Sequence, residues 1–195
     1  MSETVCVMRR LACAAATAAF AALGYRLVAT GDLTLDTGIG RRIRPLGPLS
    51  VTIDAPRDTV FDVISAPYRD RTPRALAAEL EVLERGGDMV IAAHRTPVGW
   101  GMVTTTVESV RFVRPATVSF RLLRGPVPHV VEEFALTEES GRTRVDYTGE
   151  LGTDFGSPGA RWGEVVARRW VTTVTGSLER IRVEAERRAA VGRQH

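Results

Sequence analysis

The sequence predicts an α+β fold in which an antiparallel sheet of about six or seven strands wraps around one long C-terminal helix, preceded by a hydrophobic helix. From residue 79 to residue 151, short stretches rich in valine, threonine and phenylalanine alternate with glycine, proline or charged turns, which is typical of strands. From Gly159 onward, apolar residues recur every three or four positions, which indicates an amphipathic helix. Residues 11–29 are nearly uncharged and predict the hydrophobic helix that precedes the domain.

Length and composition bound the class of protein. The 195 residues suffice for one domain of ordinary size with an appendage. The chain has no lysine, and its arginines are spread along it instead of clustering, so we expect no nucleic-acid partner. Cys6 and Cys13 both precede the predicted domain, which excludes a disulfide or a thiolate metal site within it and leaves the redox compartment open.

We divide the chain into four parts. Residues 1–30 are the hydrophobic segment, residues 31–45 a linker, residues 46–190 the domain and residues 191–195 a tail. The linker is expected because glycine and turn-forming residues follow one another there with no sustained period. Its arginines either lie on anionic lipid headgroups or are simply solvated.

The N-terminal segment is predicted to associate with a membrane through residues 11–29. This alanine-rich run follows Arg9 and Arg10, and it reaches a membrane-spanning length if Arg26 lies at the interface. A secretory signal cleaved after Ala21, leading to secretion, is one alternative, and a soluble alanine-rich helix is another. Arginines flank the run on both sides, so the side of the membrane stays open, with the larger number after the run favouring a cytoplasmic domain.

The domain opens with a strand and a helix. Leu49–Ile53 alternates apolar and polar residues, as a strand does. Pro56 and Asp58 suit the first turn of a helix, which should end before Pro67. The apolar face of this helix consists of Val60, Phe61 and Ile64.

Six further strands are expected, and the connections between them are short. Glycine-containing turns at residues 86–88 and 140–142 are hairpin signals, so neighbouring strands should pair antiparallel. The expected strands are Glu79–Glu84, Met89–Arg95, Gly101–Val113, Thr117–Leu123, His129–Thr137 and Thr143–Leu151.

The long helix should begin near Gly159 and end before Gly192. Gly176 interrupts it at a cost of about 1 kcal/mol relative to alanine, which suggests a kink or the close approach of another element. Its apolar stripe consists of Val166, Trp170, Val174, Leu178, Ile181 and Ala185.

Three stretches resemble the START-like superfamily, also called SRPBCC, which includes polyketide cyclases and dehydrases, coenzyme-Q-binding proteins and lipid-transfer domains. The stretch VTIDAPRDTVFDVIS is similar to the first strand and helix of that family, and FRLLRGPVPHVVEEFALTEESGRTRVDYTGEL to its last hairpins. The helix from Arg161 onward resembles its C-terminal helix. The resemblance covers about residues 46–190 and implies a helix-grip fold with a deep, largely apolar cavity between sheet and helix.

Two polar residues are candidates for chemistry. Phe134 and Leu136 should face inward, and the period of two then places Glu132 on the same side. A carboxylate on a cavity wall can bind a ligand or act as a general acid or base, whereas the alternatives are a solvent-facing position or an arginine partner. Tyr147, inward with Val145, offers a hydroxyl donor to the cavity or is a core aromatic residue.

The expected cavity combines these residues with aromatic and apolar ones. Trp100 lies between two glycines and is placed either to gate the mouth or to act as a lid residue without a ligand role. The predicted lining is Trp100, Met102, Phe120, Glu132, Phe134, Tyr147, Trp170 and Val174. The histidines show no metal-binding spacing, and the chain lacks nucleophile-elbow, dinucleotide and P-loop motifs, so we expect no metal and no cofactor.

The leading function is binding, transport or sensing of a hydrophobic small molecule such as a lipid, isoprenoid or polyketide-like compound, since no set of residues demands catalysis. One alternative is a cyclase, aromatase or dehydratase that uses Glu132 and Tyr147 for proton transfer. Another is a membrane-anchored protein-interaction module. The sequence specifies neither an oligomeric state nor a protein partner.

Overall fold

The computed structural model describes residues 2–69, 78–99 and 101–192. Seven antiparallel strands form one sheet in the order β1-β7-β6-β5-β4-β3-β2, so strands β2 to β7 are a meander and β1 adds beside β7. The strands are β1 (Arg42–Ile53), β2 (Leu80–Arg85), β3 (Met89–Gly99), β4 (Met102–Val113), β5 (Thr117–Arg124), β6 (His129–Glu139) and β7 (Arg142–Thr153). The predicted α+β fold class is confirmed.

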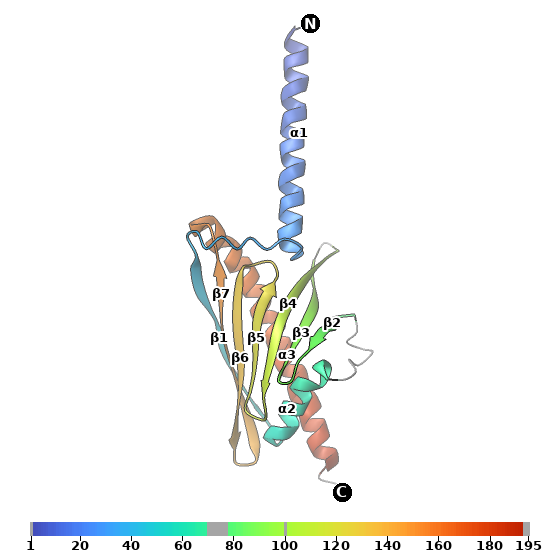
Figure 1. The fold of residues 1–195 in the computed structure, drawn as a ribbon, viewed down its shortest axis with the longest axis vertical. Helices are drawn as coiled ribbons and strands as arrows, with labels where there is room; N and C mark the ends of the chain where they lie inside the picture. Colours follow the sequence, from blue (N-terminus) through green and yellow to red (C-terminus); the bar gives the residue numbers. More distant parts are fainter. Residues whose placement is uncertain (1, 70–77, 100, 193–195) are drawn as a thin grey trace.

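The long helix α3 (Gly156–Gly192) lies across one face of the sheet, as Figure 1 shows. The shorter helix α2 (Arg57–Ser65) and the 3₁₀ turn η1 (Ala66–Tyr68) cover the end of the sheet opposite α1 (Ser2–Ala29). Alternate residues of the strands are buried against these helices because a strand directs successive side chains to opposite faces. Fully buried side chains of this core include Ile53, Val60, Val110, Val118, Val145 and Leu151.

The first strand is longer than the sequence suggests. Residues 42–46 pair with β7, and the register then shifts between Leu46 and Leu49. Gly47 lies at this irregularity with φ of +85°, and a Cβ there would be 3.1 Å from the carbonyl oxygen of Tyr147. The bulge breaks the alternating pattern, which is why the sequence predicts a strand only from Leu49.

The other boundaries differ by a few residues. Strand β3 continues past the expected end at Arg95, to Gly99, and α3 begins at Gly156 instead of near Gly159. At Gly176 no atom lies within 4 Å of the position of a Cβ, so no other element approaches closely there. Helix α3 continues through this glycine without a break.

Helix α1 extends away from the domain (Figure 1). Its residues Ala12–Ala29 are the one helical segment among the described residues that is long and apolar enough to cross a membrane. The position of this segment near the N-terminus also fits a signal sequence. The end of α1 is fastened to β4, since Thr104 Oγ1 donates to the carbonyl of Ala29 at 2.6 Å.

Residues 30–41, which we call the strap, run from α1 across the end of the sheet to β1 (Figure 1). Within the segment expected to be a linker, residues 31–45, the last four residues belong to β1 and the rest of the strap is tied to the domain. Thr34 exchanges two hydrogen bonds with the backbone of Gly125, at 2.7 and 2.9 Å. The carboxylate of Asp154 accepts from the backbone amides of Thr37 and Gly38 at 2.6 and 2.8 Å.

Candidate functional site

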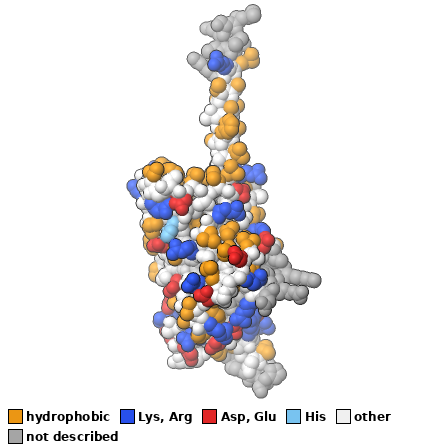
Figure 2. Space-filling view, viewed as in Figure 1, with side chains coloured by type: hydrophobic (Ala, Val, Ile, Leu, Met, Phe, Trp, Pro, Cys, Tyr) orange, Lys and Arg blue, Asp and Glu red, His pale blue; other side chains and the backbone are white. Residues whose placement is uncertain are grey.

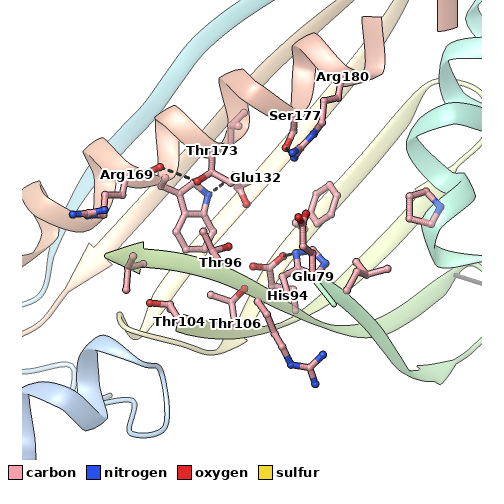
Figure 3. A pocket seen from close by; sticks show the side chains of 18 of the residues that line it. Glu79, His94, Thr96, Thr104, Thr106, Glu132, Arg169, Thr173, Ser177 and Arg180 are labelled. Atoms are coloured by element: carbon pink, nitrogen blue, oxygen red, sulfur yellow. Dashed lines mark hydrogen bonds and ion pairs between the residues drawn. The ribbon is translucent and has the colours of Figure 1, made fainter. Parts of the chain in front are cut away.

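A cavity of about 550 Å³ lies between the inner face of the sheet and α3. Strands β2 to β6 supply one wall and α3 supplies the other, while α2, η1 and the end of α1 also contribute residues. Most lining side chains are apolar or aromatic, among them Val63, Leu80, Met102, Phe120, Phe134, Val166, Val174 and Ile181. The polar ones that Figure 3 labels therefore stand out against an apolar surface.

Among these polar groups, Glu132 is a buried carboxyl with two hydrogen-bond donors. It is 5% exposed, and the alternation of β6 places it inward together with Val130 and Phe134. Its Oε1 accepts hydrogen bonds from Tyr147 Oη at 2.6 Å and from Trp170 Nε1 at 2.7 Å. Within the described parts of the chain, no group donates to Oε2.

The protonation of Glu132 is shifted by its surroundings. Burial raises the pKa of this carboxyl to about 7, and the nearby charge of Glu108 acts in the same direction. The hydrogen bonds from Tyr147 and Trp170 oppose the shift because they stabilise the carboxylate. The side chain can therefore gain or lose a proton near neutral pH.

A second polar group forms around Glu108 on β4. Its Oε2 lies 3.3 Å from Nδ1 of His94 on β3, and His94 Nε2 lies 3.3 Å from Oη of Tyr68 on η1. Burial raises the pKa of Glu108 to about 7, while the Thr106 hydroxyl acts in the opposite direction. Burial also lowers the pKa of His94 to about 4, so the imidazole is neutral at pH 7 and this contact is not an ion pair there.

A row of aromatic rings joins the two groups. The ring centroids are 6.2 Å apart for Tyr68 and Phe120, 5.6 Å for Phe120 and Phe134, and 5.2 Å for Phe134 and Tyr147. These separations are typical of packed aromatic pairs. Phe120 and Phe134 line the same cavity as the two carboxyls, so a ligand there would contact apolar rings as well as acidic groups.

The arrangement suits proton transfer or hydrogen bonding to an oxygen of a hydrophobic molecule. A carboxyl whose pKa lies near the working pH can serve as a general acid or base. Thr96, Thr106 and Ser177 add hydroxyl groups to the lining (Figure 3). In the described ranges, no three His, Cys, Asp or Glu side chains are grouped so as to hold a metal ion.

The residues proposed from the sequence fall into three sets. Tyr147 is fully buried behind the wall and does not line the cavity, because its hydroxyl is directed to Glu132. Trp100 lies outside the described residues. The other six line the cavity: Met102, Phe120, Glu132, Phe134, Trp170 and Val174. Of the alternatives considered for Glu132, neither a solvent-facing position nor an arginine partner occurs among the described residues.

The sequence reasoning missed Glu108, His94 and Tyr68. The alternation of β4, with Val110 inward, would have placed Glu108 and Thr106 on the inner face, so a signal existed for this acid. The spacing of the histidines follows no metal-binding pattern and gives no signal for His94. Tyr68 belongs to a 3₁₀ turn, and three residues are too few to show a period.

Comparisons with known proteins bear on the family. Solved structures with the same fold include the Zhui aromatase/cyclase from Streptomyces sp. R1128, which is 23% identical, with a TM-score of 0.60 over 76% of this chain and 95% of that one. A Thermus thermophilus protein, TTHA0849, is 15% identical, with a TM-score of 0.51 over 77% and 99% of the two chains. The di-domain aromatase/cyclase StfQ from the steffimycin biosynthetic pathway is 16% identical, with a TM-score of 0.54 over 77% and 52%.

Sequence comparison gives the assignment. No curated protein matches significantly. The family model described as polyketide cyclase / dehydrase and lipid transport matches residues 49–186, which is most of the chain. The chain therefore belongs to this polyketide cyclase/dehydrase and lipid transport family, and the resemblance to the START-like (SRPBCC) superfamily is confirmed.

Proposed function

We propose that the protein binds a hydrophobic small molecule in the cavity between the sheet and α3 and holds it beside a membrane. The observation that carries this proposal is the cavity itself. Its volume of about 550 Å³ lies within the usual range of ligand sites, and apolar and aromatic side chains make up most of its lining, with polar and charged ones between them. A lipid, isoprenoid or polyketide-like molecule fits this chemistry.

The polar groups of the cavity further restrict the chemical class of the ligand. Oε2 of Glu132 accepts no hydrogen bond from the described residues, and Glu108 offers a second carboxyl in the same cavity. A protonated carboxyl donates to a carbonyl oxygen, whereas a carboxylate accepts from a hydroxyl. The favoured ligand is therefore largely apolar with one or two carbonyl or hydroxyl groups.

A matched pair of substitutions on α3 tests this proposal. Thr173 lines the cavity, whereas Thr175, two residues on, does not, and each hydroxyl bonds only to the carbonyl four residues earlier. Thr173→Trp should fill the cavity and weaken ligand binding about tenfold or more, and Thr175→Trp should leave binding unchanged. Native mass spectrometry of the detergent-extracted full chain would identify a copurifying ligand, and thermal shifts with quinones and isoprenoid lipids would rank candidates.

Two outcomes would contradict it. One is a wild-type chain that carries no small molecule and shows no thermal shift with any of these lipids. The other is equal binding by the Thr173→Trp and Thr175→Trp variants, which would place the ligand elsewhere.

The second candidate function is a cyclase, aromatase or dehydratase. The observation in its favour is the pair of buried carboxyls, Glu108 and Glu132, whose pKa values are both raised to about 7. For a polyketide-like substrate, Glu132→Gln should lower turnover by about 10²–10⁴-fold while binding is retained. Glu133→Gln, on the outer face of the same strand, is the matched control. Full activity of Glu132→Gln would end this version.

Packed aromatic residues without a pocket, together with a contiguous exposed apolar patch, would favour the interaction-module alternative. Because the aromatic residues line a cavity, the first two functions have the stronger support.

A further inference from the structure

Helix α1 is hydrogen-bonded to the domain at its C-terminal end. Besides the bond from Thr104 to Ala29, the amide of Thr105 donates to the carbonyl of Thr30 at 2.8 Å. Gly31 follows with φ of +75°, and a Cβ there would be 2.2 Å from the carbonyl oxygen of Thr105. Residues 29–31 thus pack closely against β4, and only glycine fits at position 31. This contact determines where α1 departs from the domain.

The strap presents an apolar surface at this end of the domain. Thr34 faces the domain through its bonds to Gly125, so its neighbours Leu33 and Leu35 point the other way. We define the strap face as Leu33, Leu35, Ile39, Ile43 and Phe155, which are 40%, 42%, 68%, 51% and 46% exposed. Figure 2 shows hydrophobic side chains gathered along this end, where α1 departs.

Several charged groups beside the strap face have partners within the protein. Arg41 bonds to Asp36 and, at 2.7 Å, to Asp154. Asp32 accepts from the hydroxyl of Thr30 at 2.6 Å. Internal pairing of these carboxylates lowers the cost of bringing this end of the domain close to lipid.

The cavity reaches the same end. Tyr25 and Ala29 of α1 line it together with Met102 and Trp162. The rings of Tyr25 and Trp162 meet edge to face at 6.0 Å. Tyrosine and tryptophan favour the interface between water and hydrocarbon, so this pair suits a position at the membrane surface.

Together these features lead us to infer that the strap face rests on a lipid bilayer and that the cavity exchanges its ligand directly with that bilayer. The inference rests on the proposed function, in which α1 anchors the chain. If Ala12–Ala29 spans the membrane, the strap face lies at the interface, because α1 departs from that end. A lipid can then move between membrane and cavity with little exposure to water.

Depth-dependent fluorescence quenching tests the surface. The full chain, with Cys6→Ser and Cys13→Ser, is reconstituted in phosphatidylcholine vesicles with and without phosphatidylglycerol. Labels at Leu35→Cys and Ile39→Cys should be quenched by spin-labelled lipid. A label at Glu138→Cys, near the hairpin at the opposite end, should not be.

Substitutions then test the energetics. Leu35→Ser and Ile39→Ser should each lower the ratio of docked to undocked domain about tenfold and slow loading of an anthroyloxy fatty acid from the vesicles. Val113→Ser, which removes a side chain that is 53% exposed at the far end of β4, should change neither.

The inference is overturned if the labels at positions 35 and 39 are quenched no more than the label at 138, or if α1 is washed from the membrane by alkali. If the labels are quenched but no lipid enters the cavity, the surface stands and the proposed ligand function fails. Docking and binding are read separately, so the two failures can be told apart.

Discussion

At the scale of single residues, two glutamates give the cavity its chemical character. Glu132 is held by Tyr147 and Trp170, whereas Glu108 lies beside a neutral imidazole. Among the described residues, no arginine pairs with either carboxyl, although arginine is common elsewhere in the chain. A buried carboxylate without a cation is costly, so both groups keep their protons to higher pH.

This shift predicts how stability depends on pH. Between the ordinary pKa of 4.5 and about 7, the unfolded chain loses these protons while the folded chain keeps them. The free energy of unfolding should therefore fall as pH rises through this window, by on the order of 3 kcal/mol per carboxyl, and then level off. His94 acts in the opposite direction between about 4 and 6.5, since its folded pKa is lowered.

Substitution separates these contributions. Glu108→Gln and Glu132→Gln should each lose less stability than wild type between about pH 5 and about pH 8, and Glu133→Gln should follow the wild-type curve. Urea unfolding of the full chain in detergent at several pH values is the measurement. Parallel curves for all four proteins would show that neither buried carboxyl titrates in this range.

At the scale of elements, one carboxylate holds the strap. Asp154 is 2% exposed and accepts hydrogen bonds from Thr37, Gly38 and Arg41. The Arg41 guanidinium holds the pKa of this carboxyl well below its usual range. The ionised Asp154 side chain therefore stabilises the fold from mildly acidic pH upward, and this contribution is lost only in strong acid.

Removal of this carboxylate should release the strap. We expect Asp154→Ala to lower the free energy of unfolding by about 2–3 kcal/mol, because the hydrogen bonds that its carboxylate accepts from Thr37, Gly38 and Arg41 are lost. Asp36→Ala, which removes the exposed partner of Arg41, should cost less than about 1 kcal/mol. Hydrogen exchange at Thr37 and Gly38 reports the strap directly, and unchanged protection in Asp154→Ala would contradict this role.

Two glycines of α3 should respond in opposite ways to alanine. At Gly159 a Cβ would lie 1.6 Å from the carbonyl oxygen of Asp154, whereas at Gly176 it would meet no atom within 4 Å. Gly159→Ala should destabilise the protein by about 2–3 kcal/mol through overpacking, and Gly176→Ala should stabilise it by about 1 kcal/mol through helix propensity.

Thermal and urea unfolding of both glycine variants give these values. A destabilised Gly176→Ala would mean that this glycine is needed for a bend or a contact that the structure does not show.

At the scale of the whole molecule, a largely apolar cavity is combined with an apolar N-terminal helix. The cavity wall includes Tyr25 and Ala29, so the helix and the domain form one continuous surface at this end. A cleaved signal would end before these residues, near Ala21, and would leave the cavity wall in place. An anchor and a signal therefore differ in where the domain stays, and not in the shape of the site.

Intact mass distinguishes these two fates. For an anchored chain we expect the full 21.2 kDa in the membrane fraction after alkaline washing. A mass lacking residues 1–21, found in the soluble fraction, would identify a cleaved signal. Phe20→Arg should weaken retention because a charge in the middle of the span is costly, while Arg26→Lys, near the predicted interface, should not.

The sequence by itself determined the order and type of the elements. The meander of strands, the helix after Pro56 and the stripe of α3 all follow from periods of two and of about 3.6 residues, which are local properties. The same alternation placed Glu132 inward and would have placed Glu108 there too.

Only the tertiary structure decided which side chains meet. Trp170 donates to Glu132 across 38 positions of the chain, and Thr37 reaches Asp154 across 117. Tyr68, His94 and Glu108 come from three separate elements. Such contacts depend on how sheet, helix and strap pack together, and periodicity along the chain carries no information about that packing.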